Sequence, residues 1–449
     1  MTRLFGTDGV RGKAGTELTA LLAFRLGMAG AAVLAKESGK KRPSMLIGAD
    51  TRISSDMLVA ALTAGICAVG VDVYNAGVVP APAVAFLIKK YGLSAGVIVS
   101  ASHNAFGDNG IKFYNGDGHK LTDEMEDKIA ALMPGLDSIV QPTGADVGHL
   151  LKTTDSVGDY VEFLKKCVSD VSLSGLKIAL DCANGATYQS ARRVFEELDA
   201  IVDVIGDTPD GININENCGS THIETLVDFV KLGDYDMGFA FDGDGDRCFA
   251  VDEHGNVVDG DMLMSIIGTH WKQQGLLAKN TIIATVMSNL GFFKEVETNG
   301  ITAEQVKVGD RYVLERMIEG GFSLGGEQSG HIICLDHHTT GDGILTALLV
   351  AQIVIQSGRR LSKLNTMKRM PQALVNAKIK NEAKEAVLAD ESIKAEIAAL
   401  TQRFDGNGRV LIRPSGTEPL IRVMIEGEDI EEITNEAKRI ADLMEAIAK

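Results

Sequence analysis

Paired cysteines are the first feature that this sequence lacks. No CxxC pair occurs in its 449 residues, which contain six scattered cysteines: Cys67, Cys167, Cys182, Cys218, Cys248 and Cys334. This spacing fits neither a disulfide framework nor a cysteine-based metal site. We therefore expect a reducing compartment, in which these thiols serve as small core residues.

Long apolar runs are also missing. No segment approaches the roughly 20 apolar residues that a membrane-spanning helix needs. The N-terminal sequence MTRLFGTDGVRG has neither the apolar core nor the cleavage-like site of a signal peptide. The sequence thus predicts a cytoplasmic protein with no membrane partner.

Positive charge is scarce as well. The chain has 44 Lys and Arg against 61 Asp and Glu, so its formal net charge is −17. This balance argues against nonspecific binding of nucleic acid, which favours basic patches. An anionic small substrate is compatible with the charge if a pocket is locally basic. The composition leaves a homodimer open.

The patterns that are present indicate α/β architecture. Short β-branched or apolar runs alternate with helical periodicity, and the length predicts three or four domains at roughly 150 residues each. The runs MLIGAD (45–50), LKIALDC (176–182) and TIIATV (281–286) each precede a polar loop and a helical stretch. They suggest three copies of one unit, although convergent α/β units would look the same.

Polar, glycine-containing segments suggest where the domains end. Such segments lie at 134–156 and 253–260, and a third break falls near 368–371. We expect domains at 1–153, 154–255, 256–368 and 369–449. Strand-like and helical runs alternate in the last of these, which predicts a small α+β module.

Common catalytic signatures are absent too. Without G-x-S-x-G, Walker or G-x-G-x-x-G motifs, acyl transfer, ATP binding and dinucleotide binding have no support. Four polar loops remain as candidates. The first, in residues 97–114, presents Ser100, Ser102 and His103 at the end of a strand-like run. A serine there is placed as a nucleophile, but a serine that caps a turn has the same appearance.

The second loop, in residues 239–253, is the most acidic. Asp242, Asp244 and Asp246 alternate with glycines, so three carboxylates can converge on one hard cation. An EF-hand calcium site requires glycine where Arg247 stands, and it requires flanking helices where this sequence predicts strands. Magnesium fits better than calcium, and a solvated acidic turn is the alternative.

The remaining two loops carry hydrogen-bonding groups. Residues 320–335 place Glu327, Gln328, Ser329 and His331 between two strand-like runs, which suits sugar hydroxyls but is also typical of a plain hairpin. Residues 410–427 form a turn whose backbone N–H groups and hydroxyls could bind a phosphate. Its candidate residues are Arg413, Ser415, Gly416, Thr417 and Arg422.

Taken in order, five segments resemble the signature loops of the α-D-phosphohexomutase family: FGTDGVRG, SASHN, DGDGDR, GGEQSGH and RPSGTEP. DCANGAT, KVGDRYV and TTGDG look most like members that act on glucosamine phosphates. The resemblance implies three similar α/β domains with mixed sheets plus a smaller α+β C-terminal domain around a central cleft. Ala105 departs from the usual proline, which leaves its loop slightly less rigid.

The resemblance also implies residue roles at the reaction centre. Ser102 would be the phosphorylated serine, and its phosphate would bind one Mg²⁺ together with the three aspartates: Asp242, Asp244 and Asp246. Lys112 and Arg11 would flank the centre, and His103 and Arg247 would hold the phosphoserine. Lys112 is the leading candidate for the general acid or base, since a lysine among cations can have a lowered pKa.

The substrate-binding roles follow in the same way. Glu327 and Ser329 would contact sugar hydroxyls, with His331 close by. The phosphate that is not reacting would bind the fourth loop, at Arg413, Ser415, Gly416, Thr417 and Arg422.

The implied activity is that of an isomerase. It would interconvert glucosamine 6-phosphate and glucosamine 1-phosphate through a 1,6-bisphosphate intermediate. This reaction would feed UDP-N-acetylglucosamine and cell-wall precursor synthesis. Three alternatives stay open: a mutase with broader specificity for glucose or mannose phosphates, a phosphosugar phosphatase, and a sensor without catalysis.

Overall fold

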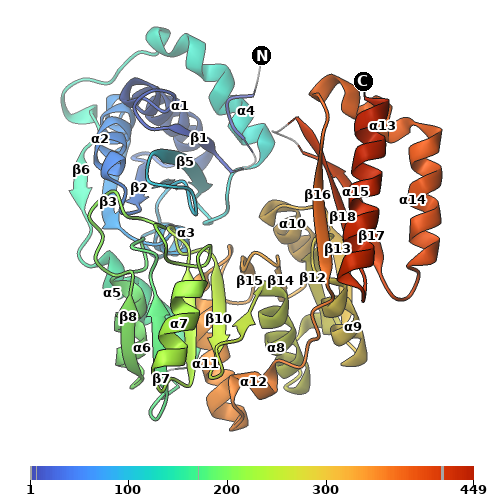
Figure 1. Ribbon diagram of the computed structural model, residues 1–449. Helices are drawn as coiled ribbons and strands as arrows, with labels where there is room; N and C mark the ends of the chain where they lie inside the picture. Colours follow the sequence, from blue (N-terminus) through green and yellow to red (C-terminus); the bar gives the residue numbers. More distant parts are fainter. Residues whose placement is uncertain (1–2, 7, 170, 416–418, 449) are drawn as a thin grey trace. The chain divides into compact units, whose positions relative to one another are not determined.

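The computed structural model describes residues 3–6, 8–169, 171–415 and 419–448 (Figure 1). The chain divides into two compact units. The first contains residues 1–287 and 300–366, and the second contains 288–299 and 367–449. Within the described ranges, no helix is long and apolar enough to cross a membrane.

A six-stranded mixed sheet opens the first unit. Its strand order is β1-β5-β4-β2-β3-β6. The strands β4, β2 and β3 are parallel, and β4 also forms an antiparallel hairpin with β5. The strands are β1 (Val10–Lys13), β2 (Ser44–Ala49), β3 (Asp72–Val78), β4 (Ala95–Val99), β5 (Asp108–Asn115) and β6 (Leu150–Lys152). Part of the predicted linker at 134–156 is therefore an edge strand.

Two smaller mixed sheets follow. The second has the order β11-β10-β9-β7-β8 and the third β13-β12-β14-β15. The second sheet contains β7 (Lys177–Asp181), β8 (Ile201–Ile205), β9 (Met237–Phe241), β10 (Cys248–Asp252) and β11 (Val257–Val258). The third contains β12 (Thr281–Thr285), β13 (Thr302–Val306), β14 (Leu324–Gly326) and β15 (Ile332–Cys334).

One four-strand arrangement recurs in all three sheets. The strands β2, β7 and β12 are each flanked by a parallel strand on either side, and the third strand of each set turns back into an antiparallel fourth. These central strands are the three runs that suggested a triplication. The predicted repeat and the α/β class with mixed sheets are therefore confirmed.

Helices cover these sheets. In the first unit they are α1 (Ala20–Ser38), α2 (Ile53–Ala68), α3 (Ala81–Lys90), α4 (Asp123–Leu132), α5 (Ser156–Cys167), α6 (Ser190–Glu197), α7 (Glu224–Leu232), α8 (Gly260–Gln273), α10 (Asp310–Gly320), α11 (Gly343–Ser357) and α12 (Leu361–Leu364). Alternation along β2 sends Met45 and Ile47 into the core shared with α1 and α2. Glycines allow these two helices to approach closely, because a Cβ at Gly65 would lie 2.1 Å from Phe24 O.

The second unit is an α+β module. Its antiparallel sheet has the order β16-β18-β17, with β16 (Gln372–Lys378), β17 (Arg409–Pro414) and β18 (Leu420–Glu426). Its helices are α9 (Leu290–Thr298), α13 (Lys384–Ala389), α14 (Glu391–Arg403) and α15 (Ile430–Ile447). One core of this unit packs Ile421, Val423 and Ile425 against Ile433 and Ile440.

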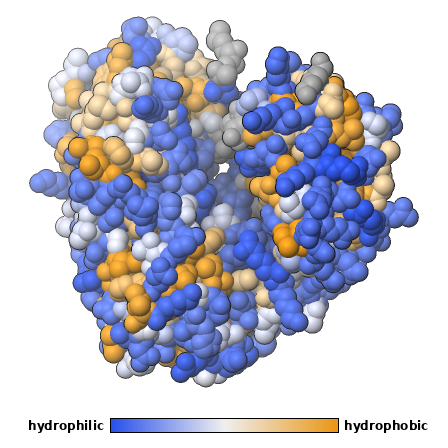
Figure 2. All heavy atoms as spheres, in the orientation of Figure 1, coloured by the Kyte–Doolittle hydropathy of each residue, from blue (hydrophilic) through white to orange (hydrophobic). Residues whose placement is uncertain are grey.

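The visible surface is mostly hydrophilic, with apolar residues in small separate groups (Figure 2). Single exposed apolar side chains, such as Leu232 and Val140, are ordinary for a folded protein. All six cysteines are free, and four of them, Cys182, Cys218, Cys248 and Cys334, are buried as predicted for core residues.

Candidate active site

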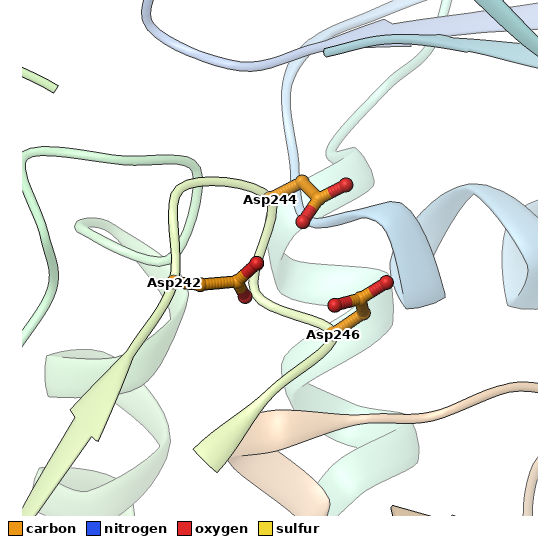
Figure 3. A group of neighbouring side chains, drawn as sticks. All are labelled: Asp242, Asp244 and Asp246. Carbon is orange, nitrogen blue, oxygen red and sulfur yellow. The ribbon is translucent and has the colours of Figure 1, made fainter. Parts of the chain in front are cut away.

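The loop between β9 and β10 brings Asp242, Asp244 and Asp246 together. Their carboxylates point toward one another (Figure 3), and one oxygen of each lies within 4.8 Å of the others. All three residues are buried, and Gly245 turns the chain in the left-handed region at φ 74°. The loop thus concentrates three acids in a volume with little water.

The electrostatics of this cluster fit a hard divalent cation. Burial, and then repulsion from its two neighbours, raises the pKa of Asp242 well above its ordinary value; burial and Asp244 raise the pKa of Asp246. Burial also favours protonation of Asp244, but Lys112 outweighs it and lowers that pKa. Among the described residues, Asp244 Oδ1 and Asp246 Oδ1 have no hydrogen-bond partner. Such oxygens are the ligands that Mg²⁺ prefers.

Ser102 lies directly against these aspartates. Its Oγ donates a hydrogen bond of 2.6 Å to Asp242 Oδ2, although 140 residues separate the two in sequence. The residue is 2% exposed and has φ 53°, a left-handed conformation that is uncommon for serine. The hydroxyl that the sequence singled out is therefore beside the acidic loop.

His103 and Arg247 lie next to Ser102. Arg247 Nη1 donates to His103 Nδ1 at 3.2 Å, and Ser102 Oγ is 3.4 Å from the same nitrogen. Burial, and then the guanidinium of Arg247, lowers the pKa of His103 to about 4. At neutral pH the imidazole is uncharged and accepts from Arg247.

Lys112 and Arg11 come from adjacent antiparallel strands, β5 and β1. Lys112 Nζ lies 2.8 Å from Asp8 Oδ2 and 2.9 Å from Asp244 Oδ2, and Arg11 bonds the Asp8 carboxylate. Burial lowers the pKa of Lys112, but Asp244 and Asp8 outweigh burial and leave it raised. The expected lowered pKa is wrong, because the nearest neighbours of this lysine are acids.

Two further charged residues continue this network. Lys120 Nζ is 3.0 Å from Asp8 Oδ1 and also pairs with Asp310 Oδ2. Asp310 Oδ2 is in turn 3.7 Å from His331 Nε2, which is 3.8 Å from Asp246 Oδ2. Alternating acidic and basic side chains thus run from Lys112, beside Asp244, around to Asp246.

Sequence reasoning gave no role to Asp8, Lys120 or Asp310. Asp8 and Asp310 lie inside FGTDGVRG and KVGDRYV, so the motifs that carried the resemblance contained the signal. Lys120 follows the turn GDGH and has no such signal. Its ion pair with Asp310 forms only where the first and third repeats pack together.

Glu327, Ser329 and His331 occupy the turn between β14 and β15. Glu327 Oε1 accepts from Gly309 N at 3.0 Å, and Ser329 Oγ donates to Glu327 Oε2 at 3.4 Å. His331 is 3% exposed, and neither of its ring nitrogens has a hydrogen-bond partner in the part of the chain that the structure describes. A backbone bridge joins His331 to Arg247, so this turn adjoins the metal loop.

The fourth candidate loop belongs to the second unit. Arg413 on β17 and Arg422 on β18 are direct cross-strand neighbours, which places two guanidinium groups at one point of the sheet. Ser415 N donates to Leu420 O at 3.0 Å, and the buried Lys384 donates to Ser415 O at 2.6 Å. Gly416 and Thr417, also predicted here, lie outside the described residues.

Family models for phosphoglucomutase/phosphomannomutase match nearly the whole chain. Alpha/beta/alpha domain I matches residues 2–139, domain II matches 158–255, domain III matches 259–370 and the C-terminal domain matches 374–443. The chain thus contains all four segments of this family in order.

Curated relatives are similar over their full length. A phosphoglucosamine mutase of Clostridium novyi (strain NT) is 54% identical over 447 residues, and one of Ruminiclostridium cellulolyticum is 53% identical over 447 residues. In both comparisons the match covers 99% of this chain and 99% of the relative.

Solved structures share the fold. A phosphoglucomutase/phosphomannomutase family protein of Burkholderia thailandensis superposes with a TM-score of 0.83 at 23% identity, covering 100% of this chain and 99% of its own. An N-acetylphosphoglucosamine mutase of Aspergillus fumigatus, in complex with GlcNAc-6P and magnesium, gives 0.71 at 18% identity, covering 99% and 96%. At these identities the likeness concerns the fold alone.

Proposed function

This chain belongs to the phosphoglucomutase/phosphomannomutase family, and from that premise we propose that it is a phosphoglucosamine mutase. It would interconvert glucosamine 6-phosphate and glucosamine 1-phosphate. The predicted family membership and the predicted isomerase class are confirmed by the full-length relatives. The phosphoserine route, the residue roles and the domain boundaries given above are part of the proposal.

One observation carries the chemistry. Ser102 Oγ lies 2.6 Å from Asp242 Oδ2, within the three-aspartate cluster. A phosphate on that oxygen would sit beside the acids that suit a divalent cation. A hydroxyl needs such surroundings if it is to receive and return a phosphoryl group, because charge must be neutralised while the oxygens are aligned.

The cycle balances without an external donor. Phosphorylated Ser102 loses its O–P bond as a sugar hydroxyl forms one. The sugar hydroxyl gives up its proton to a base, and Ser102 Oγ takes up a proton as it leaves, so the step balances. The bisphosphate then turns over, and its other phosphoryl group returns to Ser102. A bound Mg²⁺ would neutralise charge on the transferring phosphoryl oxygens.

Charged side chains would assist this transfer. Lys112, held between Asp8 and Asp244, supplies a fixed positive charge, which favours electrostatic stabilisation over proton abstraction. Arg247 and Arg11 add charge nearby, and His103 accepts a hydrogen bond from Arg247. Glu327, Ser329 and His331 would contact the sugar, and Arg413, Arg422 and Ser415 its second phosphate.

A ³¹P NMR assay of isomerisation tests the proposal. Wild-type protein should convert glucosamine 6-phosphate faster than glucose 6-phosphate or mannose 6-phosphate. Ser102→Ala and Ser102→Gly should each lower kcat by at least about 10³-fold, because neither side chain can carry the phosphate. Because the backbone at Ser102 is in the left-handed conformation, which favours glycine, the Ala variant should also be less stable than the Gly variant by about 1 kcal/mol.

Other outcomes point elsewhere. Near-normal turnover by Ser102→Ala would contradict the phosphoserine route. Steady release of inorganic phosphate without isomerisation would indicate a phosphatase, and preference for glucose or mannose 6-phosphate would refute glucosamine specificity.

A further inference from the structure

Arg52 is a buried cation just ahead of α2, and its side chain is 0% exposed. No motif marks this residue, which lies in the loop that follows β2. Its Nε donates to Asp50 Oδ2 at 2.8 Å, so the charge is paired. The pairing uses one of the five N–H groups that a guanidinium carries.

The other donors all reach one loop. Arg52 Nη2 donates to Ser102 O at 2.9 Å and to Asn104 O at 2.8 Å. Nη1 donates to Ala105 O and, at 3.1 Å, to Asp108 O. A single rigid fork therefore binds four carbonyl groups between the proposed nucleophile and the start of β5.

Asn215, from the second repeat, reinforces the same carbonyl groups. Its Nδ2 donates to Ser102 O at 2.9 Å and to Asn104 O at 3.0 Å, and the residue is 6% exposed. Gly243 of the metal loop packs here as well, because a Cβ on it would lie 2.6 Å from Ser102 O. These contacts join the backbone at Ser102 to the repeat that carries the aspartates.

The loop needs such restraint. Ser102 has φ 53°, which costs free energy for a residue with a Cβ, and Ala105 stands where a proline would stiffen the chain. Asp50 completes the arrangement, since its Oδ2 also accepts from Ser100 Oγ at 2.6 Å, and Ser100 Oγ accepts from Ser102 N at 2.9 Å. Hydrogen bonds thus connect both the N–H and the carbonyl group of Ser102 to the Asp50–Arg52 pair, the N–H through Ser100.

We propose that Arg52, with Asn215, is a positioning residue that fixes the Ser102 loop so that the serine oxygen faces the aspartate cluster. This inference rests on the proposed mutase function. A displacement of about 1 Å at a reacting group can cost on the order of 100-fold in rate. Loss of the fork should therefore slow chemistry while leaving the sugar and phosphate contacts in place.

Arg52→Lys tests this directly, because lysine keeps the charge but has three donors on one atom. We expect kcat to fall by about 100-fold with KM changed by less than about threefold. Arg42→Lys is the matched control, since Arg42 makes a two-bond contact to Asp72 and donates to Ala145 O and Val147 O. Its kcat should stay within about twofold of wild type.

A second pair guards against misfolding of Arg52→Lys. Asn215→Gly removes the side-chain donors and tolerates the residue's φ of 58°, and Asn217→Gly, at φ 53° in the same segment, is its control. We expect about a tenfold loss of kcat for Asn215→Gly, with KM steady, and none for Asn217→Gly. Amide hydrogen exchange at residues 102–108 should speed up in Arg52→Lys and Asn215→Gly alone.

The outcomes separate the two proposals. If wild-type protein isomerises glucosamine 6-phosphate but Asn215→Gly and a folded Arg52→Lys keep normal kcat, the positioning role is wrong. Equal losses in the Arg42 or Asn217 controls would also overturn it. If wild type shows no isomerisation, the proposed function fails, whereas unchanged exchange at residues 102–108 in both test variants would refute the positioning role by itself.

Discussion

At the scale of single residues, the three loop aspartates are balanced differently. Asp244 bonds Lys112 and Asp242 accepts from Ser102, whereas Asp246 Oδ1 has no hydrogen-bond partner among the described residues. Its other carboxylate oxygen faces His331 at 3.8 Å. Asp246 Oδ1 also lies 3.8 Å from Arg247 Nε, so Asp246 is paired more loosely than Asp244, whose Oδ2 lies 2.9 Å from Lys112 Nζ.

Adding Mg²⁺ should invert the order of stability of wild type and Asp246→Asn. With chelator present, the variant should melt at a higher temperature than wild type, because a buried like charge has been removed. With excess Mg²⁺ the order should invert, since each tenfold loss of metal affinity removes about 1.4 kcal/mol of the stabilisation. Differential scanning fluorimetry across a magnesium titration measures both effects without any turnover.

The exposed Asp234→Asn is the control and should leave both curves unchanged. A wild-type melting temperature that does not respond to Mg²⁺ would contradict a metal site at this cluster. So would an Asp246→Asn variant that Mg²⁺ stabilises as strongly as it stabilises wild type.

At the scale of elements, three corresponding hairpins carry the candidate chemistry. The turn between the third and fourth strands of each repeat holds Ser102 in the first sheet, the aspartates in the second, and Glu327, Ser329 and His331 in the third. In each repeat, the fourth strand follows this turn and pairs antiparallel with the third. One topology therefore presents three different sets of candidate side chains, distinguished by the loop residues.

The sequence predicted the units but not this correspondence. The central strands were found because they are continuous apolar runs, and helices α2, α6 and α9 follow the loops after these runs, as the sequence predicted. The three hairpin turns differ in length and have no common residue pattern, so comparing their sequences does not reveal the correspondence. Their equivalence becomes visible only through strand pairing.

Contacts between residues far apart in the sequence were likewise beyond sequence reasoning. The cluster at 242–246 was predictable because its three carboxylates are close together in the chain. The donors to the Ser102 loop are Arg52 of the same repeat and Asn215 of the second, and the partners of Lys112 are Asp8 of its own repeat and Asp244 of the second. Such partners depend on tertiary packing, which is why the expected direction of the lysine pKa shift is wrong.

His338 joins three elements in the same way. It follows β15, its Nε2 donates to Pro82 O of α3 at 3.0 Å, and its ring meets Phe163 of α5 edge-on at 5.4 Å. The residue is 5% exposed, and burial lowers the pKa of its imidazole to about 3. Protonation would place a charge between helices that pack through aromatic rings.

His338→Gln should make the protein less sensitive to acid. The unfolded state binds a proton near pH 6.5 and the folded state only near pH 3, so stability is lost as pH falls through this window. Urea titrations between pH 6.5 and 4 should show a slope that is shallower in the variant by up to about 1.4 kcal/mol per pH unit.

His103, whose pKa is lowered to about 4, contributes in the same direction and should leave the variant with residual acid sensitivity. The exposed His222→Gln serves as the reference and should reproduce the wild-type slope. An unchanged slope in His338→Gln would mean that this imidazole titrates normally in the folded protein.

At the scale of the whole molecule, the division into two units interrupts the sequence. Residues 288–299 belong with 367–449, so the chain passes between the units after 287, after 299 and after 366. Inside the second unit the buried Glu426 binds the inserted segment. Its Oε1 accepts from Asn289 Nδ2 at 3.0 Å, and its Oε2 accepts from Leu290 N at 3.1 Å and Arg409 Nε at 2.9 Å.

Glu426→Ala should therefore destabilise the second unit selectively. Arg409 would lose its Glu426 ion pair while remaining mostly buried, a change that typically costs about 3–5 kcal/mol. Amide exchange should accelerate across 288–299 and 367–448 while the three mixed sheets keep their protection, because these hydrogen bonds of Glu426 all lie within one unit. Hydrogen exchange with mass spectrometry resolves these segments, and the exposed Glu428→Ala is the control. Accelerated exchange in β2, β7 and β12 to the same degree would mean that the two units unfold together. Protection retained at 288–299 would mean that α9 is held in place without the Glu426 carboxylate.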